Sequence, residues 1–199
     1  MKVKIKKQGK VKEFKLINSW SDVTLETWLK LIDFETGTKT EEATETIAAL
    51  SDIPKKLIKE LSLSDVAVIM SKVGELQAKQ DTKLKRIITI NDVEYGFHPD
   101  LDSISLGEYA DIEQFIKNGI ESSLPELMSV LYRPIKLKKN DIYIIDAYDG
   151  DIRLRAEEMK LMSAEQVQSA LMFFFALGRV FSEILPLYLM ERLKETKTQ

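Results

Sequence analysis

The sequence contains no cysteine among its 199 residues. This absence excludes disulfides, zinc–thiolate sites, iron–sulfur clusters and thiol catalysis. Histidine occurs once, as His98, so a serine–histidine hydrolase would have to use that residue. Its neighbours Pro99 and Asp100 favour a turn residue after a strand over a general base.

Glycine is sparse and scattered, and the sequence has no phosphate-binding loop or dinucleotide-binding motif. The motifs G-x-S-x-G and H-E-x-x-H are also missing. The net charge is only −3, whereas proteins built mainly to hold nucleic acid are usually basic. We therefore expect a non-enzymatic protein with no cofactor and no specific nucleic-acid partner.

One long apolar run extends from residue 170 to residue 190. It could span a bilayer by length, but Arg179, Glu183 and Pro186 interrupt it, and charges within a span are costly. We therefore expect a buried C-terminal helix at about 163–194 and no membrane insertion. The lysine-rich start of the chain lacks the apolar run of a signal peptide, so secretion by that route is not expected.

The first 15 residues alternate apolar and lysine side chains around a glycine. Val3, Ile5 and Val11 are the apolar positions, and the pattern predicts a β-hairpin. A basic arm that binds nucleic acid is the alternative, but it lacks the aromatic residues that stack on bases. Lysines on an exposed hairpin would block edge-to-edge pairing.

Helical patterns follow this hairpin. Thr24 is a suitable N-cap for a helix whose apolar stripe includes Leu25 and Trp28. A second helix ends near Pro54, a short helix follows, and Ser64 is the expected cap of a longer helix. Its expected inward positions are Val68, Ile69, Val73 and Leu76. A polar segment then ends a first module, predicted at residues 1–80.

The second module is predicted at residues 81–199. It begins with a hairpin that turns at Asn91-Asp92, a pair that tolerates positive φ angles. A helix follows Ser105, and a second helix carries Pro125 in its first turn. A β-ribbon at about 136–151 precedes a short helix and the C-terminal helix, which Ser163 is expected to cap.

The two halves contain similar segments, SDVTLETWLKLIDF and DSISLGEYADIEQF, placed 81 positions apart. The offset aligns Thr24 with Ser105 and Trp28 with Tyr109. We therefore predict an α+β, mainly α-helical protein of two similar modules, each a β-hairpin followed by about three helices. The ribbon would be an insertion in the second copy. Trp28 and Tyr109 would each fix the first helix of a module onto its own hairpin.

An acidic cluster, Asp146, Asp149 and Asp151, is the best candidate for chemistry. Three carboxylates this close could bind Ca²⁺ or Mg²⁺ and serve a hydrolase or nuclease. The spacing does not match an EF-hand loop, and Asp149-Gly150 is itself a strong turn signal. We favour the turn and expect no metal site.

Candidate partner-binding residues come from three places. Tyr and Arg are enriched at binding hot spots, and the Tyr-Arg pair near residue 132 could equally form a local arrangement at a helix end. The C-terminal helix has apolar residues around more than half of its circumference, so one face packs internally and another is left for a partner. The ribbon adds two tyrosines. The candidates are Tyr132, Arg133, Tyr143, Tyr148, Phe173, Phe174 and Phe181.

Several stretches carry a resemblance to a known group: SWSDVTLETWLKLI, VEYGFHPDLDSISLGEYADIEQFI, LMSVLYRPI with the later IYIIDAYDG, and ALMFFFALG. From about Ser19 to about Gly178, the chain resembles tailed-bacteriophage proteins encoded among virion-structure and tail-assembly genes, including those of crAss-like phages. The resemblance implies a protein that binds other virion proteins within a larger assembly or oligomer, as a ring, connector, tail or packaged component.

Two alternatives remain open within this resemblance: a tail assembly chaperone that is absent from the mature virion, and a host-directed binding protein. The expected location is the virion or, during assembly, the cytoplasm of the infected bacterium. A ring would need heterologous contacts, in which one face meets a different face of the next copy.

Overall fold

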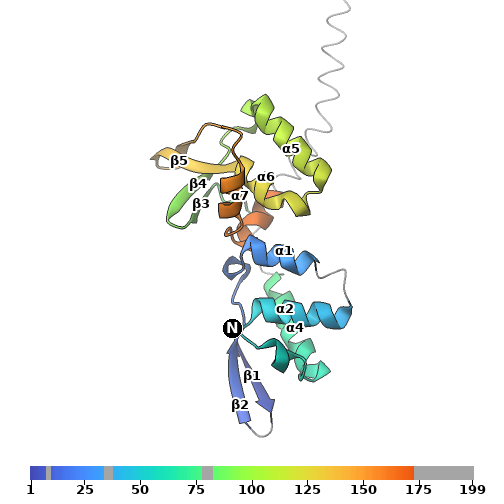
Figure 1. The fold of residues 1–199 in the computed structure, drawn as a ribbon. Helices are drawn as coiled ribbons and strands as arrows, with labels where there is room; N and C mark the ends of the chain where they lie inside the picture. Colours follow the sequence, from blue (N-terminus) through green and yellow to red (C-terminus); the bar gives the residue numbers. More distant parts are fainter. Residues whose placement is uncertain (8–9, 34–37, 78–82, 173–199) are drawn as a thin grey trace, which may run out of the picture.

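The structure is a computed structural model that describes residues 1–7, 10–33, 38–77 and 83–172. In these residues the chain is α+β, with more helix than strand and two separate antiparallel sheets of two and four strands (Figure 1). The predicted fold class is therefore confirmed at this level.

The N-terminal hairpin is observed as β1 (Lys2–Lys7) and β2 (Lys10–Lys15), with Val3 opposite Phe14. Val3 and Ile5 are buried, as the alternation predicts, because one face of the hairpin packs on the helices that follow. Leu16 then forms an isolated bridge with Ser51, which ties the end of the hairpin to the end of the second helix.

The first half continues with helices whose starts follow ordinary capping chemistry. Thr24 Oγ1 accepts a hydrogen bond from Thr27 N at 3.2 Å, as expected for an N-cap. The fourth helix begins earlier than predicted, because Ser62 and not Ser64 accepts from Asp65 N. Val68 was expected to face inward but is 55% exposed. The elements are η1 (Trp20–Asp22), α1 (Leu25–Asp33), α2 (Lys39–Leu50), α3 (Lys55–Ile58) and α4 (Leu63–Gln77).

The four-stranded sheet has the order β3-β4-β5-β6. Asn91 and Asp92 have φ angles of 48° and 63° at the first turn, as predicted for that pair. The predicted ribbon is β5 with β6, but it belongs to the sheet because Tyr95 of β4 pairs with Pro134 of β5. The strands are β3 (Ile87–Ile90), β4 (Val93–Phe97), β5 (Tyr132–Lys139) and β6 (Ile142–Ile145).

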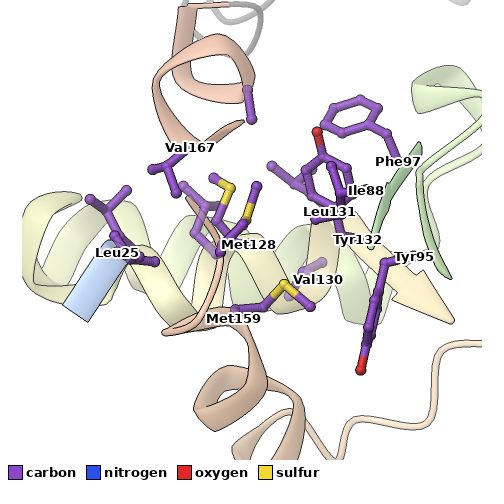
Figure 2. Packing of buried hydrophobic residues seen from close by; sticks show 14 of the residues in the cluster. Leu25, Ile88, Tyr95, Phe97, Met128, Val130, Leu131, Tyr132, Met159 and Val167 are labelled. Carbon is purple, nitrogen blue, oxygen red and sulfur yellow. The ribbon is translucent and has the colours of Figure 1, made fainter. Parts of the chain in front are cut away.

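The helices of the second half are grouped around one nearly buried helix, α6. Figure 2 shows Met128 of α6 between Leu25 of α1 on one side and Ile88 and Phe97 of the sheet on the other. Pro125 lies in the first turn of α6, as predicted. The elements are η3 (Leu101–Ser103), α5 (Leu106–Asn118), η4 (Glu121–Ser123), α6 (Leu124–Leu131) and α7 (Arg153–Met159).

The C-terminal helix is described only over residues 164–172. Ser163 caps it as predicted, since its Oγ accepts from Gln166 N at 3.2 Å and its own N donates to Gln166 Oε1 at 2.9 Å. The remainder of the predicted helix lies outside the described residues. Among the helices that are described, none is long and apolar enough to cross a membrane.

The two halves are joined by backbone pairing between residues distant in sequence. Leu25 N donates to Met162 O, and Ala164 N donates to Val23 O, each at 2.7 Å. Leu25 belongs to the hydrophobic cluster of the second half, and Ala164 to that of the first. Each half therefore contributes a side chain to the core of the other, and the predicted boundary at residue 80 stays a prediction.

The internal duplication is not confirmed. The aligned residues Leu25 and Leu106 occupy opposite environments, since Leu25 is fully buried and Leu106 is 83% exposed. The equivalence of Trp28 and Tyr109 is wrong for the same reason: Trp28 packs against both clusters, whereas Tyr109 is 53% exposed. Helix α5 instead buries Glu108 in its first turn.

Candidate interaction surfaces

The predicted residue Tyr132 lies in the core and not on a surface. Its side chain is fully buried, its ring meets Phe97 edge-on at 5.1 Å, and its hydroxyl donates to Lys85 O at 2.7 Å. Burial raises the pKa of this hydroxyl well above its usual range, so it remains a donor. Tyr132 thus fastens the segment before β3 to the end of α6.

Arg133 also points inward, into a buried ion pair. Its Nη2 lies 2.8 Å from Glu108 Oε1, and the two side chains are 5% and 4% exposed. The other carboxylate oxygen of Glu108 accepts from Ser105 N at 2.8 Å and Ser105 Oγ at 2.6 Å. His98 Nε2 lies 3.5 Å from Glu108 Oε1. Neither interpretation of this arginine describes the observed contact, which is a buried pair inside the molecule between β5 and α5 and not a cap at the end of α6.

The charges of this cluster follow from its surroundings. Burial favours the neutral carboxyl of Glu108, but the hydrogen bonds from Ser105 and the charge of Arg133 hold its pKa below the ordinary range. Burial lowers the pKa of His98. The nearby charge of Glu108 raises this pKa, but by less than burial lowers it. The cluster therefore holds one carboxylate and one guanidinium, with a histidine that favours its neutral form.

Tyr148 covers this ion pair. Its ring centroid lies 5.8 Å from Arg133 Cζ, and its hydroxyl donates to Asp111 Oδ2. Burial raises the pKa of the Tyr148 hydroxyl, and Asp111 raises it further. These contacts attach the segment after β6 to α5, so Tyr148 acts inside the molecule.

The acidic cluster forms the expected turn. Asp149 accepts from Asp151 N at 3.0 Å and from Arg155 Nη2 at 2.9 Å, while Gly150 has a φ of 77°. Asp146 pairs instead with Lys136, at 3.1 Å. Across the part of the chain that the structure describes, no group of three acidic or histidine side chains is placed to hold a metal ion.

Tyr143 is buried on the face of the sheet opposite to the face that holds Tyr132. Its hydroxyl donates to Phe97 O at 2.7 Å, and its ring lies over Gly96, where a Cβ would stand 2.4 Å from a ring carbon. Tyr143 therefore packs internally. The remaining candidates, Phe173, Phe174 and Phe181, lie outside the described residues.

The outer half of the ribbon carries an apolar surface that sequence analysis missed. A β-bulge between Ile135 and Leu137 turns Leu137 onto the face of the sheet that holds Tyr132. Leu137 pairs directly with Ile144, and Ile142 lies two residues further along the same face. We name this surface the ribbon face; its exposed residues are Val93 (43%), Leu137 (66%), Ile142 (79%) and Ile144 (57%).

A second apolar surface is a groove with a volume of about 840 Å³, between α1 and the end of α5. Its only charged lining residues among those described are Asp33 and Glu121, both acidic. We name it the α1–α5 groove; its apolar walls are formed by Trp28, Leu29, Ile32, Ile116, Ile120, Leu124 and Leu171. The lining residues of α1 and of the end of α5 are almost 90 positions apart in sequence, so the groove can be recognised only in the folded structure.

Comparison with protein-family models, with curated proteins and with solved structures finds no match to this chain. The ribbon face and the α1–α5 groove are therefore the surfaces of the described residues that bear on function.

Proposed function

We propose that the chain is a non-enzymatic bacteriophage virion structural or assembly protein that acts through protein–protein contacts. The observation that supports this proposal is the ribbon face, where three large aliphatic side chains, Leu137, Ile142 and Ile144, are each more than half exposed on one surface. Clustered apolar side chains of this kind mark interaction sites or become aggregation liabilities.

The position of the ribbon in the sheet adds to this argument. Among the described strands, β6 pairs only with β5, so it is an edge strand whose outer backbone groups can receive another strand. Natural proteins usually protect such edges when they have no partner. An apolar face beside an open edge suits another protein, and the resemblance to virion and tail-assembly proteins supplies the class of partner.

Two surfaces on one chain also support an oligomer or a larger assembly. The ribbon face belongs to the second half, whereas the α1–α5 groove is shared between the halves. We further propose that the two halves are related modules, because each places a hairpin before a helix capped by Thr24 or Ser105. The location would be the virion, or the infected cytoplasm during assembly.

The experiment that tests the proposal is mass spectrometry of purified virions, with copy number measured against the capsid protein. Presence at a constant copy number, as the closed symmetry of a ring requires, supports a structural component. Abundance in infected cells with absence from particles would indicate the chaperone or the host-directed factor instead.

A matched pair of variants tests whether the ribbon face is responsible. Ile142→Lys places a charge on the face, while Val68→Lys places the same charge at another exposed apolar position, on α4, where the side chain is 55% exposed against 79% for Ile142. We expect Ile142→Lys to reduce incorporation into particles at least about tenfold and Val68→Lys to leave it unchanged. Equal incorporation of both variants would contradict the role given to the ribbon face.

A further inference from the structure

We infer that the ribbon face of one copy docks into the α1–α5 groove of a second copy, in a head-to-tail contact. This inference rests on the proposed function and names one of its partners: the chain itself. The contact joins two apolar surfaces of the described residues, one projecting and one hollow.

The groove has the chemistry to hold a hydrophobic strand. Its apolar lining includes Trp28 and Ile32 of α1, Ile116 and Ile120 at and after the end of α5, and Leu171. Its volume of about 840 Å³ would accommodate several aliphatic side chains. Glu121 places an exposed carboxylate in its lining, so the groove favours an apolar partner with a cationic edge.

The ribbon face matches this description. Ile142 and Ile144 are its most prominent side chains on β6, and Lys139 pairs directly with Ile142, on the same face. Lys139 is exposed at the end of β5, beside the turn at Asn140. A docked ribbon would therefore bring aliphatic side chains to the apolar lining and an ammonium group toward Glu121.

The positions of the two surfaces determine the kind of assembly. Figure 1 shows the β5–β6 end of the sheet on one side of the molecule and the outer ends of α1 and α5 on the other. A surface that pairs with a different surface gives a heterologous contact, which repeats from copy to copy until it closes into a ring or continues as a filament. Four aliphatic residues form a small interface, so we expect a weak individual contact that is strengthened by closure of a ring.

The absence of cysteine makes a direct test possible, because introduced thiols are the only ones in the chain. One variant of the full chain carries Ile142→Cys on the ribbon face, and another carries Ser122→Cys on the groove wall. Both positions are exposed, so we expect both variants to fold. Each variant alone, and their equimolar mixture, is treated with a short bismaleimide, and the products are separated by denaturing electrophoresis.

We expect a covalent dimer in the mixture at a yield at least about tenfold above that of either variant alone, as a heterologous contact requires. A chain carrying both cysteines should give a ladder of covalent oligomers. Val68→Cys is the matched control, and its mixture with either variant should give only background product.

Two results would overturn the inference. A dimer formed as readily by Ile142→Cys alone would indicate a two-fold contact between ribbon faces. No dimer in any mixture, with slow reaction of Ser122→Cys toward maleimide, would indicate that another part of the chain covers the groove.

A charge exchange provides a second measurement. Sedimentation velocity should show that Glu121→Lys and Lys139→Glu each weaken self-association at least about fivefold, and that the chain carrying both changes recovers most of it. Failure of recovery would contradict the docking arrangement. Neither test affects the proposed function: if virions contain the protein but copies do not associate, the proposed function stands and its partner is a different virion protein.

Discussion

Arg133 of β5 and Glu108 of α5 form an ion pair with 2.8 Å between Nη2 and Oε1, and almost no part of either side chain reaches solvent. The pair joins the start of the ribbon strand to the first turn of a helix. Removing one member would leave the other charge buried without its counter-ion, which is far more costly than losing a surface pair.

Glu108→Gln should therefore lower the free energy of unfolding by about 3 kcal/mol. Glu113→Gln is the control on the same helix, because Glu113 pairs with Lys117 at 3.0 Å on the exposed surface. Its loss should cost less than about 0.5 kcal/mol. Urea denaturation measures both. Similar costs for the two variants would mean that the Glu108 pair is solvated and not buried.

Stability should fall as the pH drops below about 6.5. Burial lowers the folded-state pKa of His98 below its ordinary value of 6.5, so the unfolded chain binds a proton that the folded chain does not. The contribution of neutral His98 to the free energy of unfolding is therefore complete above pH 6.5 and is lost as the pH falls through the lowered pKa. The pKa of Glu108 is also lowered, so a second loss follows below its ordinary value of 4.5.

His98→Gln isolates the first of these losses because the chain has no other histidine. The variant should be less stable at neutral pH but should lack most of the fall between about pH 7 and pH 5.5. A proton NMR titration of the single imidazole measures the pKa directly. A midpoint above 6.5 would show that Glu108 outweighs burial and would reverse the sign of the prediction.

Gly96→Ala should destabilise the sheet by about 2 kcal/mol or more, because the new Cβ would stand 2.4 Å from the ring of Tyr143 and 2.8 Å from Ile145. Gly74→Ala is the opposite case. No atom lies within 4 Å of a Cβ at that position in α4, so alanine should stabilise the helix by about 0.5–1 kcal/mol. Thermal unfolding of the two variants should move in opposite directions, and equal shifts would contradict the close packing of Tyr143.

Tyr148→Phe should cost about 1 kcal/mol, since it removes the hydrogen bond to Asp111 but keeps the ring near Arg133. Tyr148→Leu also removes the aromatic face and should cost about a further 0.5–1 kcal/mol. Urea denaturation separates the two contributions. If the two variants were equally stable, the ring would contribute nothing to holding the guanidinium.

Local sequence signals predicted much of the secondary structure. Capping and alternation predicted the helix starts at Thr24, Ser105 and Ser163, and the Asn91-Asp92 turn. They failed where neighbouring choices are chemically similar: Ser62 and Ser64 can both cap, and only the observed hydrogen bonds select Ser62. Val68 was also predicted wrongly, because the apolar stripe of a helix does not indicate which of its residues another element covers.

The candidate sites were harder to predict. The side chains of Tyr132, Arg133 and Tyr143 were expected to bind partners because of their residue types, but each is buried inside the molecule. The ribbon face depends on a β-bulge beside Leu137, which changes the side-chain alternation in a way that residue types alone do not indicate. The α1–α5 groove depends on contacts between helices that are remote in sequence.

The pairing of Val23 and Leu25 with the segment around Met162 also affects how the chain can fold during its synthesis. The first half leaves the ribosome before its bridging partner, because the roughly 80 residues between them take about 4–16 seconds to synthesise at about 5–20 residues per second. During that interval Leu25 has no core to enter and Ala164 has not yet completed the first core. Final consolidation of both halves therefore waits for residues 160–164, and the two are expected to acquire protease resistance together, in a single late step.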